Sequence, residues 1–163
     1  GDPPGAMSVT DPTDGMHAPF AGILPKQYFT GIPKDAAGLA AFGEFLKQNQ
    51  STIAAVIIEP TGAHFGRTPL DPGFLEFLRA ETAARGIVLI FDECTSGFRQ
   101  TFGGLHKFFD VEPDIAVFGK TLGNGYAISA VIGRRSVMEA AHRSADQGGT
   151  IITLPLYPEL EIT

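Results

Sequence analysis

Two continuous apolar runs limit what this chain can fold into more than any other feature of its sequence. The runs are Ile53–Ile58 and Ile87–Phe91, and each of them stops at a carboxylate. Unbroken runs of this length are typical of strands that are buried on both faces of a parallel sheet. Between them, Pro72–Arg85 carries an apolar stripe at helical spacing, and Gly86 follows as a helix-stop signal. Strand, helix and strand in this order predict an α/β fold.

The same patterns predict further elements on both sides of this unit. A helix is expected over Asp35–Asn49, where apolar residues recur at helical spacing, and another over Ser136–Arg143. Short strands are expected over Asp114–Phe118 and Ala127–Ile132. We therefore expect a mostly parallel sheet with helices on both of its faces.

Three regions are expected along the chain. Residues 1–34 are rich in glycine and proline, which predicts an irregular segment with one short strand near Tyr28 and Phe29. Residues 35–150 hold the expected helices and strands and form the α/β core. Residues 151–163 show no clear periodicity and are expected to lead out of the core as a tail.

Composition and charge exclude several classes of protein. A chain of 163 residues, 44% of them hydrophobic, is long enough to bury one core. Its net charge of −6 argues against a nucleic-acid partner or an anionic membrane surface. A single cysteine, Cys94, excludes an internal disulfide and a cysteine-cluster zinc site. No apolar run reaches the ~20 residues that span a bilayer, and no secretory signal is recognisable, so we expect a cytoplasmic location.

Charged residues stand at the ends of three of the expected strands. They are Glu59, the adjacent pair Asp92 and Glu93, and Lys120. Each has an ordinary structural explanation, as a turn residue, a solvated pair and a surface lysine. However, the C-terminal ends of parallel strands lie along one edge of a sheet, so Asp92 and Lys120 should meet there. Such a lysine can form a Schiff base, and such an aspartate can pair with the protonated ring nitrogen of pyridoxal phosphate.

A P-loop ATPase is the alternative that these motifs raise. Its Mg²⁺-binding strand also ends in acidic residues, and Gly119-Lys120-Thr121 matches the end of its phosphate-binding loop. That loop requires another glycine at the position occupied by Asp114. The two motifs also occur here in the reverse of their usual order, so the sequence disfavours this alternative.

Five segments together resemble the class III aminotransferases, which are pyridoxal-phosphate enzymes of the aspartate-aminotransferase fold, fold type I. The segments are AAVIIEP (54–60), PGFLEFLR (72–79), GIVLIFDECTSGFR (86–99), VEPDIAVFGKTLGNGY (111–126) and SAVIGRR (129–135). Their order and spacing are similar to those of the family. The Gly97-Phe98-Arg99 form resembles the subgroup that contains glutamate-1-semialdehyde aminomutase. The resemblance implies that residues 35–150 are the cofactor-binding core of a fold type I large domain.

The resemblance implies roles for four residues. Lys120 is the catalytic lysine that forms the Schiff base with pyridoxal phosphate, and Asp92 is the partner of its ring nitrogen. Cys94 stands where the family usually has a valine packed on the face of the ring, and a cysteine is a small hydrophobe of similar volume. Thr150 stands where a threonine reaches the cofactor phosphate of the neighbouring subunit, which implies a homodimer.

The function implied by the resemblance is pyridoxal-phosphate-dependent transfer of an amino group. The enzyme is expected to be an aminotransferase or a 2,1-aminomutase that acts on an amino acid or on an amino aldehyde or ketone. The expected partners are small-molecule amino donors and acceptors, with no nucleic acid and no membrane. Because family members are well over twice this length, the chain resembles the middle of a large domain. The alternative is a non-catalytic remnant that does not hold cofactor alone.

Overall fold

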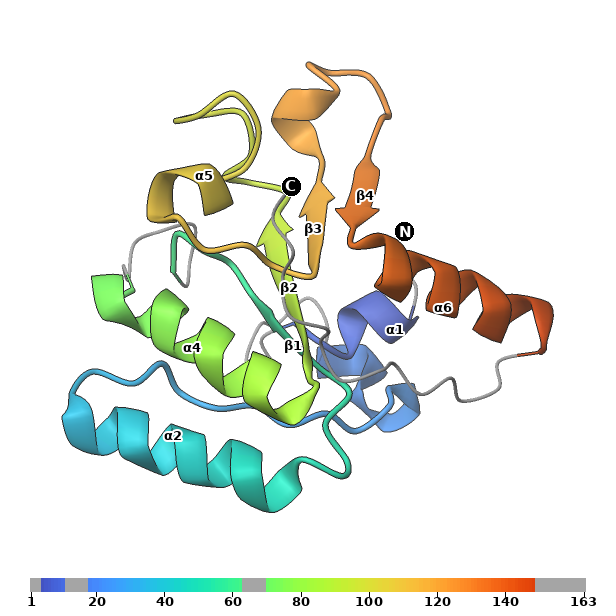
Figure 1. Cartoon of the computed structure of the whole chain (residues 1–163). Coiled ribbons are helices and arrows are strands. Elements are labelled where there is room, and N and C mark those ends of the chain that lie inside the picture. Colours follow the sequence, from blue (N-terminus) through green and yellow to red (C-terminus); the bar gives the residue numbers. More distant parts are fainter. Residues whose placement is uncertain (1–3, 11–17, 63–69, 149–163) are drawn as a thin grey trace. The chain divides into compact units, whose positions relative to one another are not determined.

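The computed structural model describes residues 4–10, 18–62 and 70–148 of the chain (Figure 1). The chain divides into two compact units, Gly1–Ile32 and Pro33–Thr163. The first unit contains a short helix, α1 (Pro4–Met7), and a 3-10 helix, η1 (Ala18–Ile23).

The strand expected near Tyr28 and Phe29 does not form, and this expectation was wrong. Both residues lie in irregular backbone with exposed side chains. A strand requires a hydrogen-bonded neighbour, and the ladders of the described residues join only segments of the second unit. β-propensity alone is therefore not sufficient here.

In the described part of the second unit, four strands form one sheet. They are β1 (Ala55–Ile58), β2 (Val88–Glu93), β3 (Ile115–Phe118) and β4 (Ala130–Gly133). Their order is β1-β2-β3-β4, with the first three parallel and β4 antiparallel to β3. The expected, mostly parallel sheet is confirmed. The connection from β3 to β4 has only a short 3-10 turn, η2 (Lys120–Leu122), and lacks the crossover that a parallel neighbour needs.

Three helices of this unit lie close to the ranges that the sequence predicts. They are α2 (Ala36–Asn49), α4 (Pro72–Arg85) and α6 (Arg135–Asp146). A fourth, the one-turn helix α5 (His106–Phe109), was not predicted. At the start of α4 the Asp71 side chain accepts a hydrogen bond from Gly73 N, and Gly86 ends the helix with φ 66°. A backbone position with a positive φ favours glycine, so Gly86 specifies where α4 ends.

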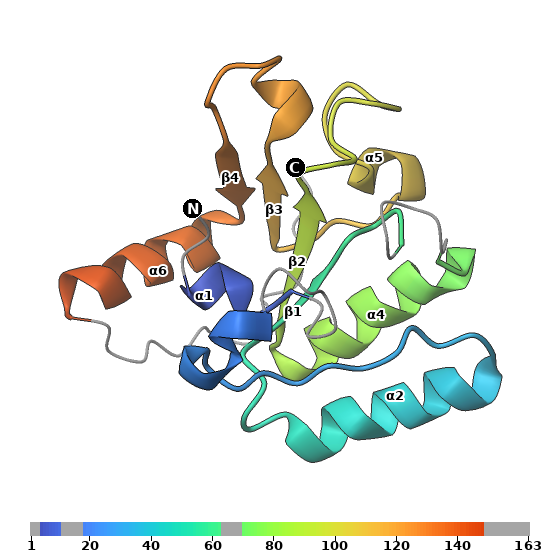
Figure 2. The same ribbon diagram turned by 180° about the vertical axis from the view of Figure 1, so that it is seen from behind.

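Helix α4 covers one face of β2, and α2 lies on the far side of α4 (Figures 1 and 2). Along β2, the side chains of Leu89, Phe91 and Glu93 are buried, and the alternate ones are half-buried. Facing them, α4 contributes Phe74, Leu75 and Leu78 to the core. The core therefore lies between the sheet and α4.

Strand β1 is less buried than the sequence predicts. The expectation that Ile53–Ile58 is buried on both faces was wrong, because Ala55 is exposed and the side chain of Ile57 is 38% exposed. Ala55 and Ile57 pair in register with Val88 and Ile90, so they lie on the face of the sheet opposite to α4. Among the described residues, β1 is also an edge strand.

The side chain of Asp114, directly before β3, contacts residues of α4, of β2 and of the segment between β4 and α6. Its carboxylate is fully buried and accepts hydrogen bonds from Arg79 Nη1 on α4 at 2.9 Å and from Leu89 N on β2 at 2.7 Å. Arg134, between β4 and α6, forms an ion pair with it through Nε at 3.1 Å. A buried carboxylate is tolerated only when it is paired in this way.

Replacing Asp114 with alanine should therefore be among the most destabilising single changes in the chain. We expect Asp114→Ala to lower the free energy of unfolding by about 3 kcal/mol, because it leaves buried donors without their acceptor. Asp35→Ala, which removes only the N-cap of α2, should cost about 1 kcal/mol. Urea-induced unfolding measures both, and equal losses would contradict the central position of Asp114.

Candidate active site

The ends of the three parallel strands bring the charged residues to one edge of the sheet (Figure 1). Glu59 follows the last residue of β1, Asp92 is the penultimate residue of β2, and Lys120 lies two residues beyond β3. In the parallel register, Asp92 is level with Val117 and Glu93 with Phe118. Lys120 is thus next to the residues that follow Glu93.

Asp92 and Glu93, adjacent in sequence, point to opposite faces of the sheet. Asp92 is half-buried on the face opposite to α4, and its Oδ1 accepts a hydrogen bond from Cys94 N at 3.0 Å. This bond fixes the direction of the carboxylate at the end of the strand. Successive side chains of a strand point to opposite faces of the sheet, so the strand geometry alone places the two carboxylates on different faces.

Glu93 is fully buried and has a structural role. Its carboxylate accepts hydrogen bonds from Leu105 N at 2.6 Å and from Ser96 Oγ at 2.7 Å. Residues 94–105 are here called the post-β2 loop. The two hydrogen bonds hold the beginning of this loop, at Ser96, and its last residue, Leu105, against the end of β2. A Cβ at Gly104 would lie 2.5 Å from Glu93 Oε1, so this close approach requires glycine.

Lys120 is positioned by a backbone turn and by a hydrogen bond of its side chain. Its φ of 43° lies in the left-handed region, which is uncommon for a residue other than glycine. Its carbonyl accepts hydrogen bonds from Gly123 N and Asn124 N. Its exposed side chain reaches the post-β2 loop, where Nζ donates a hydrogen bond to Thr95 Oγ1 at 2.6 Å.

Cys94 lies close enough to Asp92 and Lys120 to feel both charges, and it remains a thiol at neutral pH. Burial raises its pKa from the ordinary value of 9.0 to about 11, with a further contribution from the Asp92 carboxylate. Lys120 opposes this shift, and Glu59 adds to it weakly. Charged residues from the ends of β1, β2 and β3 thus all influence the Cys94 thiol. An increase of about two units in pKa lowers the thiolate fraction roughly 100-fold, so Cys94 presents an uncharged surface.

Neither Thr95 nor the structural role of Glu93 was predicted from the sequence. The signal for Thr95 is a hydroxyl residue close behind the carboxylate pair that ends a strand. Thr150, the fourth predicted site residue, lies outside the described residues.

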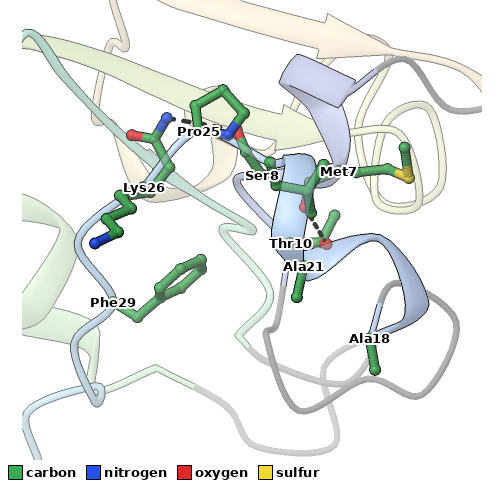
Figure 3. A pocket seen from close by; sticks show the side chains of 10 residues that line it. Met7, Ser8, Thr10, Ala18, Ala21, Pro25, Lys26 and Phe29 are labelled. Carbon is green, nitrogen blue, oxygen red and sulfur yellow. Dashed lines mark hydrogen bonds between the residues drawn. The ribbon is translucent and has the colours of Figure 1, made fainter.

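The first unit contains a cavity of about 290 Å³, which is lined by residues such as Met7, Ser8, Lys26 and Phe29 (Figure 3). Of the predicted site residues that the structure describes, none lines it. Across residues 4–10, 18–62 and 70–148, no group of three or more His, Cys, Asp or Glu is placed to hold a metal ion. No helix in these ranges is long and apolar enough to cross a membrane.

Comparison with known proteins identifies the family. The sequence model of the class-III aminotransferases matches residues 1–157. The chain belongs to this family. The glutamate-1-semialdehyde 2,1-aminomutase of Pelotomaculum thermopropionicum is 42% identical over 137 residues, which cover 77% of this chain and 32% of the relative. That of Methanocaldococcus jannaschii is 46% identical over 94 residues, or 58% of this chain and 22% of the relative.

A solved structure confirms the expected fold. A transaminase with PLP bound superposes with a TM-score of 0.62 at 29% sequence identity, over 73% of this chain and 27% of that protein. The family, the aminomutase-like subgroup and the fold type I architecture are therefore as the sequence resemblance implied. The chain spans about a third or less of the length of these three relatives.

The opposite orientations of Asp92 and Glu93 predict different costs of removing them. We expect Glu93→Ala to lower the free energy of unfolding by about 2–3 kcal/mol, because buried donors of Leu105 and Ser96 lose their acceptor. Asp92→Ala should cost less than about 1 kcal/mol, because its acceptor bond is only partly buried. Thermal or urea unfolding of the two variants would show comparable losses if the assignment of faces is incorrect.

Alkylation of Cys94 tests whether the three residues are neighbours. Asp92→Asn should speed the reaction with iodoacetamide at pH 8, because losing the carboxylate lowers the pKa of Cys94. Lys120→Asn should slow it, because losing the ammonium raises that pKa, and asparagine tolerates the positive φ. In the unmodified chain the rate should keep rising up to about pH 11. Lys107→Asn is the control, and an effect equal to that of Lys120→Asn would contradict the site.

Proposed function

We propose that this chain carries the cofactor-binding core of a pyridoxal-phosphate enzyme that transfers an amino group, with Lys120 as the residue that binds the cofactor covalently. The observation that carries the proposal is the position of Lys120, whose amine is held at the same strand ends as Asp92 and Cys94. Membership of the class-III aminotransferases supports the same assignment.

The residues at the strand ends fit pyridoxal phosphate chemically. Lys120 presents an exposed amine to an aldehyde, and Asp92 presents a carboxylate that a backbone N–H keeps in place. Near both of them, Cys94 offers an uncharged, half-buried surface for an aromatic ring. When bound, the cofactor supplies a protonated ring that accepts the electrons released from a substrate carbon.

Each residue then has a definite task. The Asp92 carboxylate would keep the proton on the ring nitrogen, because a negative charge beside that atom favours its protonated form. Lys120 Nζ, as a free amine, would take the proton from the substrate Cα as a general base. Cys94 would pack against the ring and, as a thiol of raised pKa, would not compete with Lys120 for the aldehyde.

The relatives suggest the reaction in more detail. Their name, glutamate-1-semialdehyde 2,1-aminomutase, favours an aminomutase that acts on a small amino aldehyde, and the transaminase structure keeps an aminotransferase as the second candidate. We further propose that the protein works as a homodimer in the cytoplasm. In such a dimer, Thr150 would reach the cofactor phosphate of the neighbouring subunit, and small-molecule amino donors and acceptors would be its partners.

Covalent labelling tests the role of Lys120. The chain has five lysines, so incubation with pyridoxal phosphate, borohydride reduction and peptide mass spectrometry can compare them in one sample. We expect the adduct on Lys120 to exceed that on each other lysine by about tenfold or more, because Asp92 and Cys94 lie at the same strand ends as Lys120 and would retain the cofactor there.

Two variants control the labelling experiment. Lys120→Arg keeps the positive charge but should remove the selective adduct, whereas Lys107→Arg should leave it unchanged. Equal labelling of Lys107 and Lys120 would overturn the proposal and would favour a non-catalytic remnant of the family.

A further inference from the structure

We propose that Thr95 is the positioning residue for Lys120, and that its hydroxyl holds the lysine amine in both of its protonation states. The inference rests on the proposed function, in which that amine has to lose and regain a proton. It is carried by the contact between Lys120 Nζ and Thr95 Oγ1 at 2.6 Å, which joins the end of β3 to the post-β2 loop.

Without a partner, the amine of Lys120 would have no fixed position. The lysine side chain has a flexible four-carbon stem, and this one is exposed. The backbone at Lys120 is fixed by its turn, so the remaining freedom is that of the side chain. The contact with Thr95 restricts this freedom at the atom that reacts.

Thr95 can hold the Lys120 amine because hydrogen bonds fix the backbone of the loop around it. Gly97 N donates a hydrogen bond to Glu93 O at 2.8 Å, which closes a turn around Thr95. The Thr95 carbonyl accepts a hydrogen bond from Arg99 Nε, and the next residue, Ser96, donates to the buried Glu93 carboxylate at 2.7 Å. The hydroxyl therefore projects from a fixed backbone.

The post-β2 loop is also packed against the strand that supplies Lys120. The ring of Phe98 lies 5.5 Å from that of Phe118, measured between centroids, and Phe118 is two residues before Lys120. A Cβ at Gly97 would lie 2.6 Å from the Phe118 ring, so only glycine allows this approach. Both partners of the contact are thus held by one packed unit.

A hydroxyl suits this position because it both donates and accepts hydrogen bonds. It accepts from the ammonium form of Lys120 and donates to the lone pair of the neutral amine. A carboxylate would only accept, and would hold the lysine in its charged form. Threonine therefore keeps the amine in place while its proton leaves and returns.

A measurement without cofactor tests the positioning itself. NMR relaxation of ¹³Cε-labelled lysines reports the mobility of each side chain on the picosecond to nanosecond timescale. In the unmodified chain, the ε-methylene of Lys120 should be more ordered than that of Lys47, an exposed lysine on α2. Thr95→Val should make the ε-methylene of Lys120 clearly more mobile, and Thr95→Ser should restore its order.

Thr52→Val is the matched control, because Thr52 is an exposed threonine whose hydroxyl bonds Asn49 O. It should leave Lys120 unchanged. Equal mobility of Lys120 and Lys47 in the unmodified chain, or no effect of Thr95→Val, would overturn the proposal.

A second measurement connects positioning with reactivity. The ratio of reductive pyridoxal phosphate attachment at Lys120 to that at Lys107 should fall about tenfold in Thr95→Val and in Thr95→Asp at pH 8. Thr95→Ser should stay close to the unmodified chain. A ratio unaffected by Thr95→Val would overturn the proposal. Absent attachment in every variant, with the NMR result as expected, would overturn the proposed function and still support the role of Thr95 in holding the amine.

Discussion

The arrangement of the sheet depends on the hydrogen bonds and ion pairs of the buried Asp114 carboxylate. It accepts from Leu89 N while Asp114 N donates to Leu89 O, so the register of β2 against β3 is fixed where β3 begins. A slip of one residue would turn every side chain of a strand to the other face. Asp92 would then point toward α4 and Glu93 away from it. A structural ion-pair network at one edge of the sheet thus determines the chemistry available at the opposite edge.

The same sheet geometry gives two neighbouring carboxylates different environments. Glu93 is buried on the α4 side, and both of its carboxylate oxygens accept hydrogen bonds, from Leu105 N and from Ser96 Oγ. Asp92, on the other face, keeps one carboxylate oxygen bonded to Cys94 N and influences the Cys94 thiol. One carboxylate therefore organises the loop, and the other is available to a ligand. Neither role follows from residue type alone.

Local signals in the sequence were sufficient for the elements but not for the contacts between them. Helix α4 was predictable because Asp71 and Gly86 specify its two ends. The position of Asp92 and Lys120 at the same end of the parallel strands was predictable from strand order. The contact with Thr95 was not, because it depends on a positive φ at Lys120 and on tertiary packing of the post-β2 loop. The exposure of Ile57 likewise depends on what covers that face, which an apolar run does not encode.

Backbone strain is concentrated where the two loops of the candidate site meet. Phe98 and Lys120 both have a positive φ, of 61° and 43°, and each such position costs of order 1–3 kcal/mol in a residue other than glycine. Strain of this kind persists only where surrounding contacts over-determine the backbone. Here those contacts are the buried Glu93 carboxylate on one side and the packing of Phe98 on Phe118 on the other. The stability supplied by buried groups is thus used to hold a lysine in a conformation that it would not adopt alone, with its amine beside Thr95.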